Sequence, residues 1–133
     1  MRLKLYDTKV FRFEAAHNLV GYAGACANVH GHSYKLEVTV SGYIDPSSTF
    51  PASECMVMDF KDISSLVKRL IIDTHDHTDL NRIYPNPTAE YMVATIFGVI
   101  SKELPVDVTL ESVKLWETET SYAEYRGEKA DGE

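Results

Sequence analysis

The spacing of apolar residues changes twice along the chain, and this change restricts the possible fold more than any other feature of the sequence. Between residues 11 and 17, and again between 34 and 41, apolar and polar side chains alternate, as in strands with one buried face. Two stretches between Asp59 and Leu104 instead have apolar residues every three or four positions, as in amphipathic helices. Alternation returns at 106–115 and 121–126. The pattern predicts the order β-β-α-α-β-β.

The ends of these elements carry local signals. Asp59 stands at the expected N-cap of the first helix and Thr88 at that of the second. Pro105 is expected to stop the second helix, because proline lacks the backbone N–H that a helix needs. The alternation changes parity near Glu111 and Ser112, which predicts a β-bulge.

The predicted elements suit one small domain. With 133 residues the chain is close to the usual domain size, and we expect residues 1–133 to form one unit with a polar tail at about 128–133. Runs of strands on either side of two adjacent helices are typical of α+β proteins. We therefore predict an α+β fold with a four-stranded antiparallel sheet and two helices on one face.

The net charge limits the partners of the protein. There are 20 Asp and Glu against 13 Lys and Arg, a formal net charge of -7, so we expect neither nucleic acid nor an anionic membrane as a partner. A small anionic substrate is compatible, because salt screens distant charges over about 8–10 Å. The chain shows no apolar signal-peptide run and no stretch of the roughly 20 apolar residues that span a membrane. We expect a soluble, cytoplasmic protein.

Three histidines fall at the ends of the first two predicted strands. His17 ends the first strand on its apolar face, and the two-residue spacing of His30 and His32 points both to one face if the second strand begins this early. Three neutral imidazoles with one open position are the arrangement of a catalytic zinc site. The alternative is that the three are ordinary polar side chains at strand ends.

Cys26 lies four residues before His30, in the Gly- and Ala-rich segment 18–33 that we predict to be a loop. Two roles are open for its thiol. It is either a fourth ligand, which would close the zinc site as in a non-enzymatic zinc-binding module, or a thiol beside the metal that acts as nucleophile or general base. Cys55 is expected to be a packed thiol, because free cysteine is often buried.

Three acidic or imidazole side chains are further candidates. Asp76 and His77 are adjacent, and they form either a proton-transfer pair, if the carboxylate orients the ring, or a plain polar loop between the helices. Glu117 shares parity with Val113 and Leu115, so an inward-facing carboxylate that needs a partner is one interpretation and a surface carboxylate is the other.

Several short motifs occur together in one order. They are Phe13-Glu14-Ala15-Ala16-His17, Cys26-Ala27-Asn28-Val29-His30-Gly31-His32-Ser33-Tyr34, Met58-Asp59-Phe60, Asp76-His77 with Leu80-Asn81, Pro87-Thr88-Ala89-Glu90, and Glu117. Together they resemble the superfamily of 6-carboxytetrahydropterin and 6-pyruvoyltetrahydropterin synthases, over residues 10 to 127. The sequence departs from the commonest pattern at Thr74-His75, where a Leu usually precedes the Asp-His pair.

The resemblance implies a small tunnelling fold whose sheets assemble into barrels, typically hexamers of two stacked trimers with active sites between subunits. It also implies a pterin triphosphate substrate, 7,8-dihydroneopterin triphosphate, and a Zn²⁺ cofactor. The implied roles are zinc ligands for His17, His30 and His32, catalytic thiol for Cys26, proton-transfer partners for Asp76 and His77, pterin anchor for Glu117, and a place near the pterin pocket for Thr88.

The spacing of Cys26 and His30 ranks the possible reactions. A separation of four residues resembles the bacterial and archaeal 6-carboxytetrahydropterin synthases of the queuosine and archaeosine pathways, whereas the animal pyruvoyl enzymes have more residues between the two. The resemblance therefore favours a lyase that forms 6-carboxy-5,6,7,8-tetrahydropterin and releases acetaldehyde and triphosphate. The alternative is 6-pyruvoyltetrahydropterin synthesis by triphosphate elimination from the same substrate, which begins with the same proton transfers.

Overall fold

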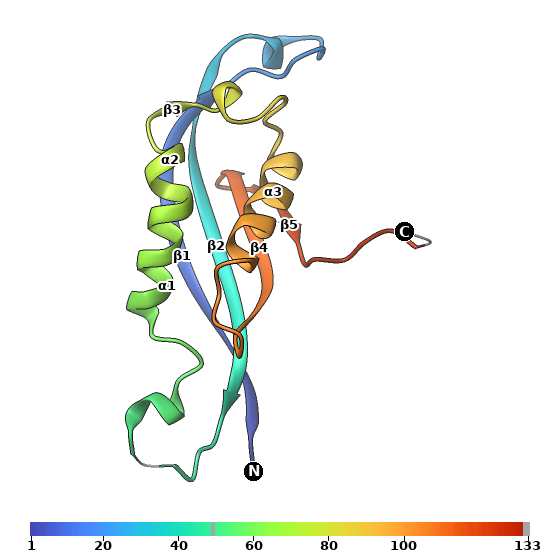
Figure 1. The fold of residues 1–133 in the computed structure, drawn as a ribbon. Coiled ribbons are helices and arrows are strands. Elements are labelled where there is room, and N and C mark those ends of the chain that lie inside the picture. The colour runs from blue at the N-terminus through green and yellow to red at the C-terminus, as the bar shows by residue number, and fades with distance from the viewer. Residues whose placement is uncertain (49, 132–133) are drawn as a thin grey trace.

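One mixed sheet of five strands organises the fold, in the order β3-β1-β2-β4-β5 (Figure 1). The computed structural model describes residues 1–48 and 50–131. The neighbours β1 and β2, β2 and β4, and β4 and β5 are antiparallel, whereas β3 runs parallel to β1. The strands are β1 Leu3–His17, β2 His30–Ile44, β3 Thr78–Asp79, β4 Thr109–Thr118 and β5 Ser121–Tyr125.

The α+β class is confirmed, but the prediction of a four-stranded antiparallel sheet is wrong. The additional strand β3 has two residues, which pair with Ala15 and Ala16 at the edge of β1. So short a strand leaves no alternation in the sequence. It forms because the chain leaving the first helical segment binds the edge of β1, where the backbone N–H of His77 donates to the carbonyl of Glu14.

Two helical segments follow β2. The first begins with α1 (Phe60–Val67), passes through the π-helical turn η3 (Lys68–Ile72) and ends with α2 (Asp73–His75). The second is α3 (Ala89–Ser101), which ends before Leu104 and Pro105. Both predicted N-caps are confirmed, since the Asp59 carboxylate accepts from the Lys61 N–H at 2.9 Å and the Thr88 hydroxyl from the Tyr91 N–H at 3.1 Å. Short 3₁₀ turns lie at Ala25–Ala27 (η1), Ala52–Cys55 (η2) and Leu80–Arg82 (η4).

The hydrophobic core lies between one face of the sheet and both helical segments. Leu36 and Val38 of β2, Ile63 of α1 and Ile96 of α3 are at most 1% exposed and belong to one cluster. Each such side chain contributes about 1.5–3 kcal/mol to folding through burial. The alternate residues of β2, such as Glu37, are only half-buried on the opposite face. The helices therefore cover the face toward which His17 also points.

Two β-bulges shape β4. The first confirms the predicted parity change, because Glu111 falls between the pairs Thr39–Ser112 and Val40–Leu110 and has no partner of its own. The second falls at Glu117, between Trp116 and Thr118 in the pairing with β5. A bulge redirects the side chain of the extra residue. The second bulge thus sets the direction of the Glu117 carboxylate at the end of the sheet that carries the histidines.

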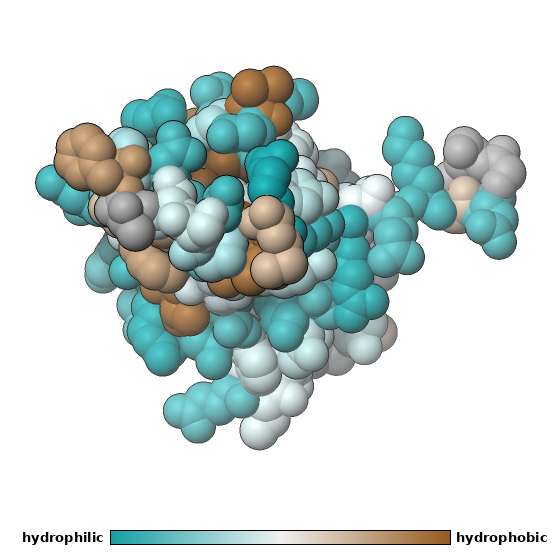
Figure 2. Space-filling model, turned by 90° about the horizontal axis from the view of Figure 1, so that it is seen from below, coloured by the Kyte–Doolittle hydropathy of each residue, from teal (hydrophilic) through white to brown (hydrophobic). Residues whose placement is uncertain are grey.

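The remaining surface is mixed. Seen from the end that carries the N-terminus, apolar side chains lie scattered among polar ones, and the described part of the C-terminal segment projects from the body (Figure 2). Residues 126–131 are exposed, and residues 132–133 of the expected tail lie outside the described part of the chain. Within residues 1–48 and 50–131, none of the helices has the length and apolar character needed to cross a membrane.

Candidate metal centre and active site

Three imidazoles converge where β1 ends and β2 begins. His17 and His30 are partners in the strand register, and His32 lies on the same face of β2. The ring centroids are 4.7 to 5.0 Å apart, and one ligand atom from each residue lies within 4.8 Å of the other two. His17 is buried and the other two are half-buried. The predicted grouping of the three histidines is therefore present, and it can hold a metal ion.

The hydrogen bonds of the cluster fix the tautomers of two rings. His17 Nδ1 lies 2.8 Å from the carbonyl oxygen of Pro87, and His30 Nδ1 lies 2.7 Å from that of Asn28. A carbonyl oxygen only accepts, so each Nδ1 carries the proton and donates it. In the neutral rings both Nε2 atoms then present lone pairs. This is the usual arrangement of metal-binding histidines, whose second nitrogen donates to a carbonyl or carboxylate.

The spacing of the free nitrogens fits a metal ion. The Nε2 atoms of His17 and His30 are 3.1 Å apart, and Nε2 of His32 is buried without a hydrogen-bond partner. Two nitrogens about 2.0–2.1 Å from a tetrahedral zinc ion lie about 3.3 Å apart. Two lone pairs at such a distance repel each other unless a proton or a cation lies between them. The donor set of three neutral nitrogens suits zinc.

Burial changes the pKa of two side chains in and beside the cluster, His32 and Tyr34. Burial lowers the pKa of His32 below its usual value, and the nearby Glu117 carboxylate opposes only part of this effect. Burial, with a smaller contribution from Glu117, raises the pKa of the Tyr34 phenol well above its usual range. The Tyr34 hydroxyl, 3.3 Å from His17 Nδ1, therefore stays protonated. A neutral imidazole is the form that binds a metal.

Glu117 lies beside the cluster and lines a hollow. Its Oε1 is 3.6 Å from His32 Nε2, and its side chain is 32% exposed. The carboxylate thus faces the cluster and not only solvent. The hollow, of about 450 Å³, lies between the start of α3 and the β4–β5 turn. Its lining residues are Ala89, Glu90, Glu117, Ser121, Tyr122, Ala123 and Glu124.

The sequence reasoning missed Glu90 as a lining residue. Glu90 is exposed and faces the same hollow as Glu117, from the first turn of α3. Its position in the sequence could have identified it, because Glu90 lies two residues after the N-cap Thr88. A helix that begins beside the end of a strand brings the first residues of the helix close to the last residues of the strand, here Glu90 and Glu117. Thr88 itself uses its hydroxyl to cap α3.

Asp76 and His77 form a pair on the edge of β1. Asp76 Oδ1 lies 3.1 Å from His77 Nδ1 and accepts from the backbone N–H of Glu14 at 2.9 Å. The Glu14 hydrogen bond, and then the contacts with His77, hold the pKa of the Asp76 carboxyl below its usual range. His77 has a left-handed backbone, with φ of 56°, and its side chain is 79% exposed. The pair is oriented by the backbone on one side and open to solvent on the other.

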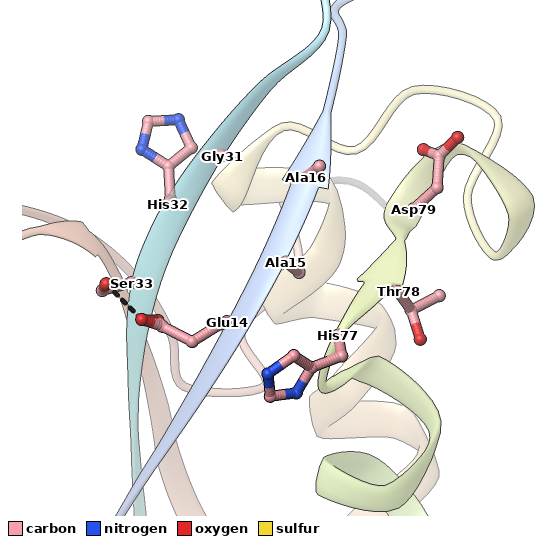
Figure 3. A pocket seen from close by; sticks show the side chains of 9 residues that line it. All are labelled: Glu14, Ala15, Ala16, Gly31, His32, Ser33, His77, Thr78 and Asp79. Carbon is pink, nitrogen blue, oxygen red and sulfur yellow. Dashed lines mark hydrogen bonds between the residues drawn. The ribbon is translucent and has the colours of Figure 1, made fainter.

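His77 and His32 line a hollow of about 530 Å³ (Figure 3). In Figure 3 the two rings stand apart, with Glu14 between them, and Glu14 accepts a hydrogen bond from Ser33 at 2.7 Å. Thr78 and Asp79 of β3 complete one wall of this hollow. His77 of the pair and His32 of the cluster therefore line one hollow and stand apart within it.

The two cysteines lie outside the histidine cluster. Cys26 is half-buried in the η1 turn, where its carbonyl accepts from the Leu19 N–H at 2.9 Å. The metal-binding group found among the described residues consists of the three histidines alone. Cys55 is exposed, with its thiol donating to the Ser48 carbonyl at 3.0 Å, so the prediction of a packed thiol is wrong. The η2 turn holds Cys55 on the surface because Ala52–Cys55 contains no buried residue.

Comparison with known proteins places this chain in a family. The family model for 6-pyruvoyl tetrahydropterin synthase matches residues 7–128. A 6-carboxy-5,6,7,8-tetrahydropterin synthase of Haemophilus influenzae is 34% identical over an alignment of 141 positions, which covers 90% of this chain and 96% of that protein. A 6-pyruvoyl tetrahydrobiopterin synthase of Homo sapiens is 36% identical over 112 residues, 79% of this chain and 72% of that protein. The 6-pyruvoyl tetrahydropterin synthase structure from Caenorhabditis elegans has a TM-score of 0.77 at 25% identity, covering 95% of this chain and 97% of that one. The chain belongs to the 6-pyruvoyl tetrahydropterin synthase family.

Proposed function

We propose that this protein is a zinc-dependent lyase that converts 7,8-dihydroneopterin triphosphate to 6-carboxy-5,6,7,8-tetrahydropterin, acetaldehyde and triphosphate. The observation that carries the proposal is the cluster of His17, His30 and His32, in which two Nδ1 atoms donate to carbonyls and the free nitrogens converge. The four-residue spacing of Cys26 and His30 favours the carboxy product. The relative in Haemophilus influenzae bears the name of that synthase.

The residues around the cluster suit the roles that the reaction needs. A zinc ion bound by the three histidines would polarise an oxygen of the substrate side chain and so acidify the neighbouring protons. Cys26 as thiolate would remove and return such protons, together with His77, whose ring Asp76 orients through the 3.1 Å contact. Glu117 would accept hydrogen bonds from the pterin ring in the 450 Å³ hollow and fix its orientation. Thr88 would contribute from the start of α3.

We also propose that the active protein is a homo-oligomer, a hexamer with sites between subunits. The described sheet ends at β5 on one side, and on the other β3 covers only Ala15 and Ala16 of the long strand β1. An open edge presents unpaired backbone groups that can pair with a strand of another chain. His77 and His32 stand apart in one chain (Figure 3). Pairing of the sheet edges of two copies would allow His77 of one copy to lie beside the histidine cluster of the other.

The test is to incubate the zinc-loaded protein with 7,8-dihydroneopterin triphosphate and identify the pterin and the small products. Acetaldehyde and a 6-carboxy pterin are the expected result. A pterin that retains its three-carbon side chain would instead establish the alternative, 6-pyruvoyltetrahydropterin synthesis, which the name of the human relative favours. Absence of turnover, together with unfolding when zinc is removed, would indicate a zinc-binding module in which the metal is structural.

A further inference from the structure

His75 is a buried histidine outside the metal cluster, and both of its ring nitrogens are engaged. It is 4% exposed and packs edge-on against Phe13, with ring centroids 5.7 Å apart. Its Nδ1 lies 2.7 Å from the Ile71 carbonyl oxygen, and its Nε2 lies 2.6 Å from the Tyr84 hydroxyl. Tyr84 is 3% exposed. The two side chains thus form a hydrogen bond closed off from water.

The direction of these hydrogen bonds follows from the partners. The Ile71 carbonyl only accepts, so Nδ1 of His75 donates to it, and in the neutral ring Nε2 accepts from the Tyr84 hydroxyl. Burial lowers the pKa of His75, which keeps the ring neutral. Ile71 lies in the π-helical turn η3, and its carbonyl also accepts from the Thr74 hydroxyl at 2.9 Å. One ring therefore connects the end of the first helical segment to Tyr84.

The His75–Tyr84 hydrogen bond joins two segments that each contain or approach residues of the site. Asp76 and His77 follow His75 directly, and their contacts with the backbone of Glu14 place them on β1. Tyr84 begins the segment that leads to Pro87, whose carbonyl accepts from His17. The Tyr84 N–H donates to the Leu80 carbonyl at 2.9 Å, which fixes the other end of this segment. Tyr84 is therefore an anchored partner for His75.

We propose that His75 is a positioning residue, whose hydrogen bond to Tyr84 holds the Asp76–His77 pair at the edge of β1 in its working orientation. The proposal rests on the proposed function, because it concerns the efficiency of that proton-transfer pair. His75 does not line either hollow beside the cluster. A Leu side chain at this position would fill the buried space without a hydrogen bond to Tyr84.

Comparison of single and double variants separates positioning from stability. His75→Leu leaves the Tyr84 hydroxyl buried without a partner, and Tyr84→Phe does the same to His75 Nε2, so each lowers the melting temperature. The double variant replaces both partners with apolar groups, a change that is often close to neutral for stability.

In the double variant we expect the melting temperature to recover. We expect kcat to stay about 10- to 100-fold below wild type with KM unchanged, which is the usual cost of a displaced catalytic group. His75→Gln, which keeps an acceptor for Tyr84, should recover part of kcat. Recovery of kcat together with stability in the double variant would overturn the proposal.

Amide hydrogen exchange gives a test that does not need turnover. The Glu14 N–H donates to Asp76 and the His77 N–H donates to Glu14, so both report the placement of the pair. In the double variant these two amides should exchange about tenfold faster, while the Val38 amide in the centre of β2 keeps its wild-type rate. Unchanged exchange at both amides would refute the positioning role. Absence of wild-type turnover would refute the proposed function alone, because the exchange result does not depend on it.

Discussion

His17 and His30 face each other across the β1–β2 pairing with their Nε2 atoms 3.1 Å apart. Because each Nδ1 donates to a backbone carbonyl, neither ring can turn its proton toward the other without breaking a hydrogen bond. The strand register thus sets two lone pairs against each other at a separation suited to a shared cation.

The first prediction concerns His32, the third member of the cluster. The wild-type protein should bind about one zinc ion per chain, and His32→Ala should lose both the metal and turnover, because two imidazoles alone hold zinc weakly. Metal content after dialysis measures the effect. His77→Ala is a matched control, since its ring is 79% exposed and outside the cluster, and it should keep its zinc. Full occupancy in His32→Ala would remove His32 from the ligand set.

The second prediction concerns Cys26, for which two roles are open. Cys26→Ala should keep zinc and lower turnover by about 10²-fold or more, the usual scale for loss of a proton-transfer group. Metal content and kcat are measured on the same sample. Cys55→Ala is the control, because Cys55 is exposed and its thiol donates to the backbone carbonyls of Asp45 and Ser48, and this variant should behave as wild type. If Cys26→Ala loses zinc, the thiol is a ligand.

The periodicity of the sequence predicted most of the framework. Several predicted features depend on patterns within a few consecutive residues, and the structure has each of them: the strands at 11–17 and 34–41, both N-caps and the bulge at Glu111. The grouping of the three histidines also followed from strand parity, because residues two apart share a face and the paired strand ends meet. Such features need no knowledge of distant contacts.

The features that the sequence did not predict depend on contacts between segments that are far apart in sequence. The strand β3 exists only because residues 76–79 dock on β1, and two residues are too few for a periodic signal. The roles of Pro87 and Asn28 as carbonyl acceptors for His17 and His30 are carried by the backbone, which the residue type does not reveal. The His75–Tyr84 hydrogen bond is of the same kind, since a histidine in a polar run gives no sign that it is buried.

The third prediction is a pH dependence of stability that originates in His75. Burial lowers the pKa of this ring in the folded state, so below about pH 6.5, the usual histidine value, the unfolded chain binds a proton that the folded chain does not. Stability from this residue is therefore complete above that pH and is lost as the pH falls. The free energy of unfolding of the metal-free protein should decline below pH 6.5 with a slope approaching about 1.4 kcal/mol per pH unit for this group.

The control for this dependence is the double variant His75→Leu with Tyr84→Phe. Burial also lowers the pKa of His32, which adds a decline of the same sign in both proteins. The difference between the two denaturant-melt series, taken from about pH 8 to about pH 5, isolates the contribution of His75. Parallel pH profiles for wild type and double variant would show that His75 is not buried as a neutral ring.

The last prediction concerns Glu117, whose Oε1 lies 3.6 Å from His32 Nε2 at the rim of the 450 Å³ hollow. Among the described residues none donates a hydrogen bond to its carboxylate, so ring N–H donors of a bound pterin would be its first hydrogen-bond partners. Hydrogen bonds to charged groups contribute about 1.5–3 kcal/mol. Glu117→Gln should therefore weaken the binding of a non-reacting pterin by roughly 10- to 150-fold. Titration of the zinc-loaded proteins with sepiapterin or biopterin measures this change.

Glu124→Gln is the matched control for this titration. Glu124 lines the same hollow, but its carboxylate accepts from Arg126 at 3.1 Å and is already partnered. This variant should bind pterin nearly as well as wild type. Zinc content should stay the same in both variants, because neither carboxylate belongs to the histidine cluster. Equal pterin affinity in wild type and Glu117→Gln would contradict the anchoring role, whereas loss of zinc in Glu117→Gln would show that this carboxylate acts on the metal through His32 instead.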